Sequence, residues 1–248
     1  YFIEEFLRNE KQEKSVFKYC QLDAKDYEKK IEYIKSKKLK HLDHFKSKYE
    51  TSTLFNKLAK ANIDYNYYFN KEIYPFVHYG KNKGEILSAL PTGFYDYRKN
   101  VNYNDDFLKD YFSYQSFLKS NFNNLALKVH LDHSKKDYFD SKSVCFTLDK
   151  LKIIDSLVDN ASIKNDLLYH YTINFLTKNK SESCSEAVLK SFLAKSDNKE
   201  HNDLIQHYSS AIYKLKKGNL LPEVAIIDCK NNEHDINAVI NTPTVFCF

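Results

Sequence analysis

The chain has 248 residues, a length that accommodates one or two domains with a sizeable core. Its 38 basic and 33 acidic residues give a net charge of +5. The two signs alternate along most segments, which is typical of a solvated surface and excludes the one-sided basic face of a nucleic-acid binder. The most basic run, residues 35–48, alternates with apolar residues at helical spacing. This spacing favours an exposed helix face over a polyanion or membrane-surface contact.

Glycine and proline number only four each, whereas an all-β chain would need many more turns, so long helices are expected. With 20 Tyr, 18 Phe and no Met or Trp, aromatic rings are expected to fill much of the core. The cysteines are far apart and form no Cys-x-x-Cys, which indicates neither a zinc site nor a small disulfide framework, although one disulfide stays open. They are Cys20, Cys145, Cys184, Cys229 and Cys247.

The sequence starts at Tyr1 and contains no Met, so we expect it to be part of a longer protein. A signal peptide or a lipid anchor would then lie ahead of Tyr1. No apolar run approaches the about 18 residues that cross a bilayer, so no transmembrane segment is expected within the sequence.

Helical spacing predicts three helices in the first part of the chain. The first covers residues 1–19. The second begins at Asp23 or Asp26, whose carboxylates can accept from the open first-turn amides. The third begins after the hydroxyl residues 51–53 and is expected to kink or end near Pro75, which lacks an amide donor.

The longest irregular stretch, Leu90 to Asn104, is rich in aromatic residues. Loops of this length either pack down on their own side chains or carry function. Packing is the simpler interpretation, and a ligand or partner contact is the alternative. Asp96 and Arg98 could clamp a ligand, although a local ion pair or turn hydrogen bond explains them more simply. The candidate contact residues are Phe94, Tyr95, Asp96, Tyr97 and Arg98.

Short helices with short connections follow, and they predict an antiparallel helical array. A polar connection near residues 132–146 is a candidate sub-boundary. The expected helices run from Asn104 or Asp105 to about His130, from Leu148 to Val158 with Thr147 as cap, from Ile163 to Leu176 after a corner at Asn160, from Ser183 or Ser185 to Leu193, and from about Asn202 to Lys216 before Gly218.

Two histidine pairs, His41 with His44 and His130 with His133, have the i, i+3 spacing of one helix face. Such a pair can hold a metal if a third ligand approaches, but neither lies in a His-Glu-x-x-His motif. Surface histidines are the simpler interpretation, and His170 is best explained as a core or boundary residue. No phosphate loop, nucleophile elbow or paired catalytic carboxylate is present. We therefore predict no catalytic, cofactor-binding or metal-binding residue in these 248 positions.

The last thirty residues differ in character from the rest. They consist of a strand at Val224 to Asp228, a polar turn at Lys230 to His234, an amphipathic stretch at Asp235 to Ile240 and a strand at Thr244 to Phe248. Two strands alone cannot bury their faces, so a domain that continues beyond Phe248 is expected. The predicted fold is mainly α, with a helical domain at residues 1–217 and the first two strands of an incomplete α/β domain at 218–248.

This tail resembles the opening of the TlpA-like branch of the thioredoxin superfamily. Gly218, Leu221 and Pro222 match the family's entry, and the two predicted strands with the amphipathic stretch between them match its first elements. The turn at 230–234 lacks the usual glycine, and Asn241 to Pro243 replaces a common Lys-Gly-Lys. Cys247 lies inside a strand and corresponds to neither redox cysteine, since the family's Cys-x-x-Cys follows the position of Phe248.

The helical part resembles the region ahead of the thioredoxin-like domain in exported proteins of Bacteroidota. The resemblance implies a lipoprotein or periplasmic protein of the cell envelope. It is carried by His44-Phe45-Lys46, Leu90-Pro91, Gly93 to Asp96, Asn123 to Ala126, Asp149 to Leu151, Ile154 to Leu157, Lys164-Asn165, Leu167-Leu168, Phe192-Leu193 and Ser196.

Two functions follow as expectations. In the first, the helical domain is a binding or scaffold module of an envelope assembly, its partner is a protein, and no active site lies in the sequence. In the alternative, the protein is an exported thiol–disulfide oxidoreductase that acts on protein disulfides and has its Cys-x-x-Cys just beyond Phe248.

Overall fold

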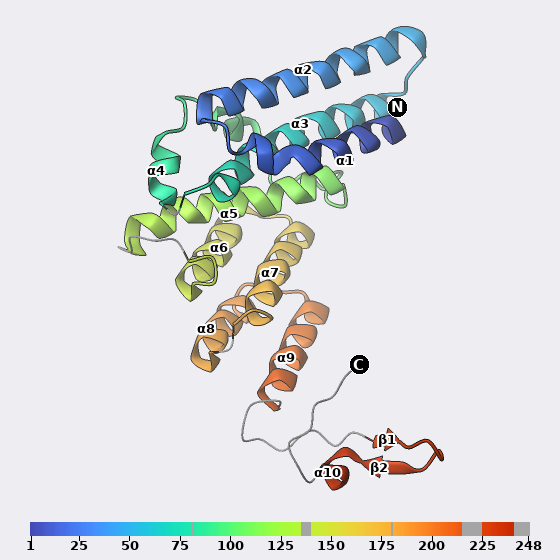
Figure 1. Cartoon of the computed structure of the whole chain (residues 1–248), viewed down its shortest axis with the longest axis vertical. Helices are drawn as coiled ribbons and strands as arrows, with labels where there is room; N and C mark the ends of the chain where they lie inside the picture. Colours follow the sequence, from blue (N-terminus) through green and yellow to red (C-terminus); the bar gives the residue numbers. More distant parts are fainter. Residues whose placement is uncertain (81, 135–139, 180, 215–224, 241–248) are drawn as a thin grey trace. The chain divides into compact units, whose positions relative to one another are not determined.

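The computed structural model divides the chain into two compact units, Tyr1–Ser196 and Asp197–Phe248 (Figure 1). The sequence led us to expect a domain boundary at residue 218. In the structure the second unit begins at Asp197, so it also contains the helix at Lys199–Lys214. The mainly α prediction is confirmed, because the described residues form helices and one two-stranded sheet. The structure describes residues 1–80, 82–134, 140–179, 181–214 and 225–240.

Two of the first three helices, α2 and α3, begin at residues whose side chains cap them. The bounds of the three are α1 Phe2–Tyr19, α2 Ala24–Lys48 and α3 Thr53–Val77. Asp23 Oδ1 accepts from the Asp26 amide at 3.0 Å, and Ser52 Oγ accepts from the Phe55 amide at 3.1 Å. Because these caps satisfy first-turn amides, they define the helix starts, as the sequence predicted. Pro75 lies in the last turn of α3, which ends two residues later, also as expected.

The segment between α3 and the central helix differs from the prediction. It contains α4 (Lys83–Ser88) and a 3-10 helix, η1 (Asp96–Asn100), and α5 runs from Phe112 to Ser134. A helix start at residue 104 or 105 was therefore wrong. Asp105 Oδ1 accepts from the amide of Leu108 and closes a turn, while Asn104 Oδ1 accepts from the distant Asn160 amide at 2.9 Å. These bonds hold the segment as turns.

The next helices are α6 Val144–Leu157, α7 Ala161–Leu176 and α8 Glu182–Leu193. Helix α6 begins one turn earlier than the sequence analysis placed it, because Ser143 and not Thr147 is its cap. The Thr147 hydroxyl instead donates to the carbonyl of Ser143 at 3.2 Å, which is the bond of a residue already inside a helix. Asn160 caps α7 and confirms the predicted corner.

Helix α5 is the centre of the first unit. It packs on α3 on one side and on α6 on the other, while α2 covers α3, and α6 contacts α7 and α8 (Figure 1). Aromatic rings fill much of the core, as expected: the Tyr27 and Tyr74 rings stack at 4.4 Å, and their hydroxyls donate to backbone carbonyls. The largest fully buried side chains are Tyr27, Tyr74, Tyr114, Phe94, Phe117, Phe122, Phe146, Phe192, Ile63, Leu118, Leu127 and Leu151.

The second unit contains α9 (Lys199–Lys214), β1 (Ala225–Ile227), β2 (Glu233–Asp235) and α10 (Ile236–Val239). The strands pair antiparallel, with Ile226 opposite His234. Strand β2 lies partly within the predicted turn 230–234, because the Asp228 carboxylate accepts two amides of that segment and tightens the turn. The expected strand at 244–248, Cys247 and the entry at 218–222 lie outside the described residues.

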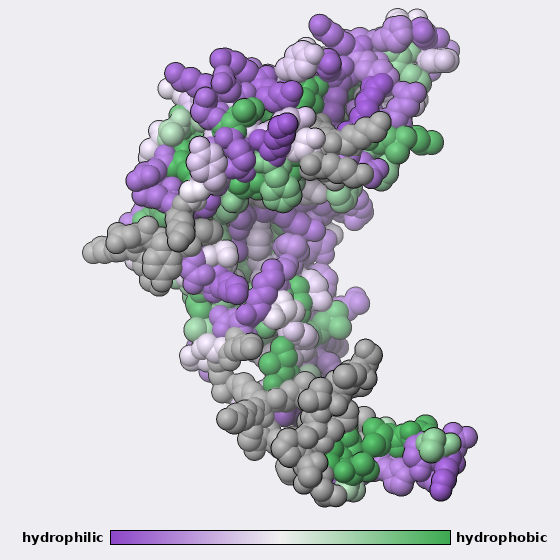
Figure 2. Space-filling view, in the orientation of Figure 1, coloured by the Kyte–Doolittle hydropathy of each residue, from purple (hydrophilic) through white to green (hydrophobic). Residues whose placement is uncertain are grey.

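The surface agrees with the charge pattern. Hydrophilic and hydrophobic residues are mixed over the visible face, with hydrophobic residues at the amino-terminal end of α1 (Figure 2). Across the described ranges, none of the helices combines the length and apolar character needed to cross a bilayer.

Candidate functional site

The aromatic loop is packed down on α3. Gly93 has φ +80°, and a Cβ there would lie 2.9 Å from the Asp96 carboxylate, so glycine suits this turn. Phe94 follows and is 2% exposed, within the core. Its carbonyl accepts from Lys71 Nζ at 2.7 Å, and the same ammonium binds Glu28 at 2.7 Å. Phe94 therefore packs into the core, as the simpler of the two interpretations of the loop predicted.

Glu72 of α3 joins the loop to α5. Its carboxylate is fully buried and accepts from Arg98 Nε at 2.8 Å, Arg98 Nη2, the Tyr97 hydroxyl and Asn121 Nδ2 at 2.6 Å. Burial lowers the pKa of Arg98, but the Glu72 carboxylate raises it, and the net pKa is above the ordinary value. Asp96 is exposed and pairs with Lys99 at 2.8 Å. Asp96 and Arg98 thus have separate partners.

A hollow of about 610 Å³ lies beside the same loop. Four of the five candidate contact residues contribute to its wall: Phe94, Tyr95, Asp96 and Arg98. Tyr95 is held in place because its hydroxyl accepts from Asn124 Nδ2 at 2.8 Å and its ring lies 3.8 Å from the Arg98 guanidinium. The loop hollow has a mixed wall: Leu87, Leu90, Pro91 and Leu131 are apolar, and Arg98, Asn124, Lys128 and Asp132 are polar.

A second opening, the α1–α5 groove, has a volume of about 340 Å³. Exposed rings flank it: Phe6 is 68% exposed and Phe112 is 76% exposed. Three of its polar residues are bonded to one another: Ser113 Oγ donates to Asn62 Oδ1 at 2.8 Å and accepts from Asn66 Nδ2 at 3.1 Å. The groove is lined by Phe2, Phe6, Asn9, Glu10, Asn62, Asn66, Tyr111, Phe112 and Ser113.

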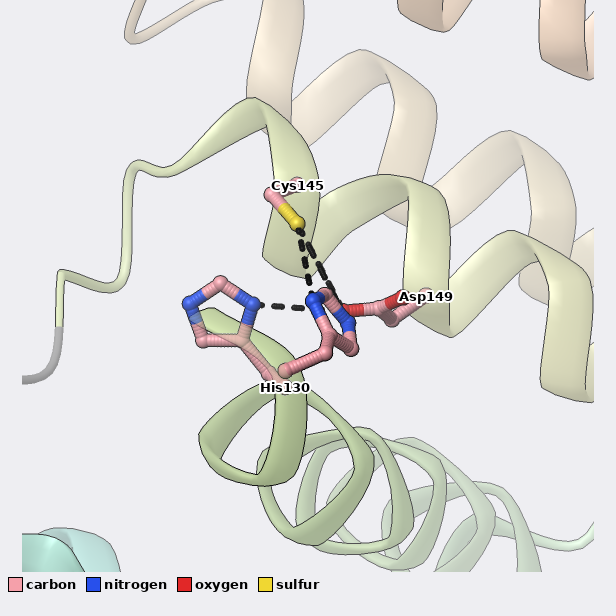
Figure 3. A group of neighbouring side chains, drawn as sticks. His130, Cys145 and Asp149 are labelled. Atoms are coloured by element: carbon pink, nitrogen blue, oxygen red, sulfur yellow. Dashed lines mark hydrogen bonds and ion pairs between the residues drawn. The ribbon is translucent and has the colours of Figure 1, made fainter. Parts of the chain in front are cut away.

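Two histidines near the end of α5 meet a cysteine and an aspartate near the start of α6. The candidate ligand atoms of His130, His133, Cys145 and Asp149 all lie within 4.8 Å of one another. Asp149 Oδ2 lies 3.2 Å from His130 Nδ1 and 2.9 Å from His133 Nε2. Figure 3 shows His130, Cys145 and Asp149 pointing toward one another from two helices. We call these four residues the His/Cys/Asp cluster.

The cluster extends from the core to the surface. The side chains of His130 and Asp149 are 4% and 14% exposed, whereas that of His133 is 44% exposed and Cys145 is exposed. The His130 ring contacts the buried Phe146 ring, with centroids 5.5 Å apart, which fixes the inner end of the cluster. Two imidazoles, a thiol and a carboxylate are groups that bind zinc and related transition metals.

The remaining histidines that the sequence singled out have ordinary surroundings. His41 pairs with Glu4 and Glu5, and His44 is exposed. His170 is half-buried, and burial, followed by the positive charges of nearby lysines, lowers its pKa to about 4. This agrees with a boundary histidine that stays neutral.

The sequence predicted His130 and His133 to be surface residues, which is wrong for His130, because its side chain is 4% exposed. Cys145 and Asp149 were not among the candidates. The missing signal was the i, i+4 spacing of Cys145 and Asp149, one short connection after the i, i+3 histidines. Because the helix was expected to start at Leu148, Cys145 was placed outside it. The spacing of Cys145 and Asp149 therefore did not indicate a shared helix face. With Ser143 as the cap, α6 includes Cys145, and Cys145 and Asp149 lie on the same helix face.

No family model, curated protein or solved structure matches this chain. The geometry of the described residues is therefore the basis for the proposed binding sites.

Proposed function

We propose that the helical unit is a binding module of a cell-envelope assembly, and that it holds a protein partner in the α1–α5 groove. The observation that carries this proposal is the exposure of large apolar side chains around that groove. Contiguous exposed apolar surface rimmed by polar residues commonly marks a protein interaction site.

Helix α1 presents an apolar face to solvent. Phe2, Ile3, Phe6 and Leu7 are 39%, 77%, 68% and 50% exposed. The opposite side of the helix is attached to α2, because the buried Glu5 carboxylate contacts His41 Nδ1 at 3.0 Å. The apolar face therefore stays outward while the helix is held in place.

The start of α5 supplies the other wall of the groove. Phe112 projects as the first residue of α5, and the neighbouring Tyr111 hydroxyl donates to the Leu58 carbonyl at 3.3 Å. The bonded side chains of Asn62, Asn66 and Ser113 make the floor polar and fixed. An amphipathic segment of a protein would suit this groove, because its apolar residues could meet the rings while its polar residues face Asn9 and Glu10.

The placement of this module in a thioredoxin-like envelope protein rests on the resemblance of the tail. Strand β1 and helix α10 support that proposal, since they lie within the expected first strand and the expected amphipathic stretch, whereas β2 begins in the segment that was expected to be a turn. We propose the periplasm or the outer-membrane-associated envelope as the location. An oxidoreductase acting on protein disulfides remains the alternative, and a Cys-x-x-Cys after Phe248 would favour it.

Photo-crosslinking in cells tests the binding proposal. A photoreactive amino acid replaces Phe6 or Phe112 in the full-length protein, and matched control positions are Tyr33 and Tyr49, which are 54% and 58% exposed. We expect a discrete adduct with another protein from the groove positions and none from the controls. Equal labelling at all four positions would contradict the proposal. An adduct between two copies of the chain would show self-association instead.

A further inference from the structure

We propose that the His/Cys/Asp cluster binds one divalent transition-metal ion, with zinc as the best fit, and that the ion ties α5 to α6. The four side chains come from two helices, and His130, His133, Cys145 and Asp149 each offer one ligand atom. None of these positions belongs to the groove or the loop hollow, so this site is additional to the proposed binding function.

The distances between four pairs of ligand atoms are close to those of a tetrahedral site. With zinc bonds of about 2.0–2.1 Å to nitrogen or oxygen and about 2.3 Å to sulfur, ligand atoms should lie about 3.3 Å apart, or about 3.6 Å where sulfur is one of the pair. Asp149 Oδ2 lies 3.2 Å from His130 Nδ1 and 2.9 Å from His133 Nε2. Cys145 Sγ lies 4.0 Å from both His133 Nε2 and Asp149 Oδ2. Since all the candidate ligand atoms lie within 4.8 Å of one another, side-chain shifts of about an ångström or less would bring them to tetrahedral spacing.

The charge of the ligand set also suits a divalent ion. A thiolate at Cys145 and a carboxylate at Asp149 supply two negative charges, and two neutral imidazoles complete the set. Cys145 lies in the first turn of α6, where the helix amides stabilise negative charge. Nitrogen and sulfur donors select zinc, cobalt or copper over calcium and magnesium, which prefer oxygen.

The number of ligands indicates the role of the ion. Four protein ligands leave no open position for water or substrate, which is typical of a structural zinc site. The helices α5 and α6 are joined by a connection between Ser134 and Val144, and an ion bound to both would close that hairpin near its tip. The exposed Cys145 and the half-exposed His133 give the ion access from solvent.

Hydrogen bonds from the two imidazoles to Asp149 would explain part of the same geometry without a metal. Cobalt(II) distinguishes the two explanations, because thiolate ligation gives a near-ultraviolet charge-transfer band and tetrahedral geometry gives intense visible bands. The full-length protein is stripped with a chelator, titrated with cobalt, and then back-titrated with zinc. We expect one equivalent of cobalt to produce both bands and one equivalent of zinc to remove them.

Variants assign the signal to residues. Cys145→Ser is at an exposed position and should leave the fold intact while abolishing the thiolate band. Asp149→Asn keeps the shape of the side chain, and should weaken zinc binding by about 100-fold or more, since even outer partners of a metal ligand contribute 10- to 100-fold. Cys184→Ser and His44→Ala are the matched controls outside the cluster and should bind as the wild type does.

Two results would overturn the proposal. One is the absence of a cobalt–thiolate band in folded wild-type protein, as judged by circular dichroism. The other is wild-type zinc affinity in both Cys145→Ser and Asp149→Asn. In either case Asp149 is only a hydrogen-bond acceptor for the two histidines.

Discussion

The guanidinium of Arg98 donates two hydrogen bonds to the carboxylate of Glu72, from Nε to Oε1 at 2.8 Å and from Nη2 to Oε2. The carboxylate is fully buried, and the arginine side chain is 18% exposed. Since η1 carries the arginine and α3 the glutamate, the pair fixes the aromatic loop against the centre of the helical unit. Arg98 also forms part of the wall of the loop hollow.

Removal of one partner of this pair should destabilise the protein strongly. Arg98→Ala leaves the Glu72 charge buried without its ion pair, and we expect a loss of about 3–5 kcal/mol in the free energy of unfolding. Lys99→Ala is the control, because its pair with Asp96 is exposed and should change stability by less than about 1 kcal/mol. Urea denaturation measures both. Similar losses of unfolding free energy in the two variants would show that the buried pair stabilises the protein no more than the exposed pair does.

His170 should make stability depend on pH. Its folded pKa of about 4 lies below the unfolded value near 6.5, because of burial and then of Lys119, Lys150 and Lys178. Above about pH 6.5 both states are neutral and the full stability is present. As the pH falls from about 6.5 to 4, the unfolded state gains the proton first, so stability is lost over this window.

The measurement compares urea midpoints at pH 7 and pH 5 for the wild type and for His170→Gln. The wild type should lose more stability on acidification than the variant. His44→Gln, at an exposed position, should behave as the wild type does. An unchanged pH dependence in His170→Gln would show that this histidine titrates normally in the folded protein.

Zinc should stabilise the folded protein through the His/Cys/Asp cluster. A ligand that binds only the folded state at 100 times its dissociation constant adds about 2.7 kcal/mol. We expect the thermal midpoint to rise on zinc addition and to return after chelation, and we expect no such rise in Cys145→Ser. A rise of the same size in the variant would place the zinc effect elsewhere.

The rings around the α1–α5 groove should contribute little to stability. Phe6→Ser and Phe112→Ser remove exposed side chains, and we expect changes within about 0.5 kcal/mol. Phe117→Ala, at a fully buried position, should cost about 3–5 kcal/mol. If the Phe112 variant unfolds as readily as the Phe117 variant, its ring supports the fold and is not reserved for a partner.

Local chemistry made much of the helical unit predictable. Asp23, Ser52 and Asn160 each accept from first-turn amides, so the sequence places the starts of α2 and α3 at their caps and that of α7 within two residues. Low glycine and proline content indicated the mainly α fold. Asn104 misled the prediction, because it looked like a cap for the following residues but bonds to amides 55 and 56 positions away.

The cluster escaped prediction for a related reason. A cysteine and an aspartate four residues apart share a helix face only if the helix already includes the cysteine, and that depends on Ser143 rather than Thr147 as the cap. Their approach to His130 and His133 depends further on the packing of α5 against α6. Sequence spacing alone carries neither piece of information.

A crystal structure of the zinc-loaded protein tests most directly whether the His/Cys/Asp cluster binds a metal ion. Data collected at the zinc absorption edge locate the ion without reference to the side chains. We predict one anomalous peak bounded by His130, His133, Cys145 and Asp149, at about 2.0–2.3 Å from each ligand atom. A peak elsewhere, or four cluster side chains that keep their hydrogen bonds around an empty centre, would contradict the proposal.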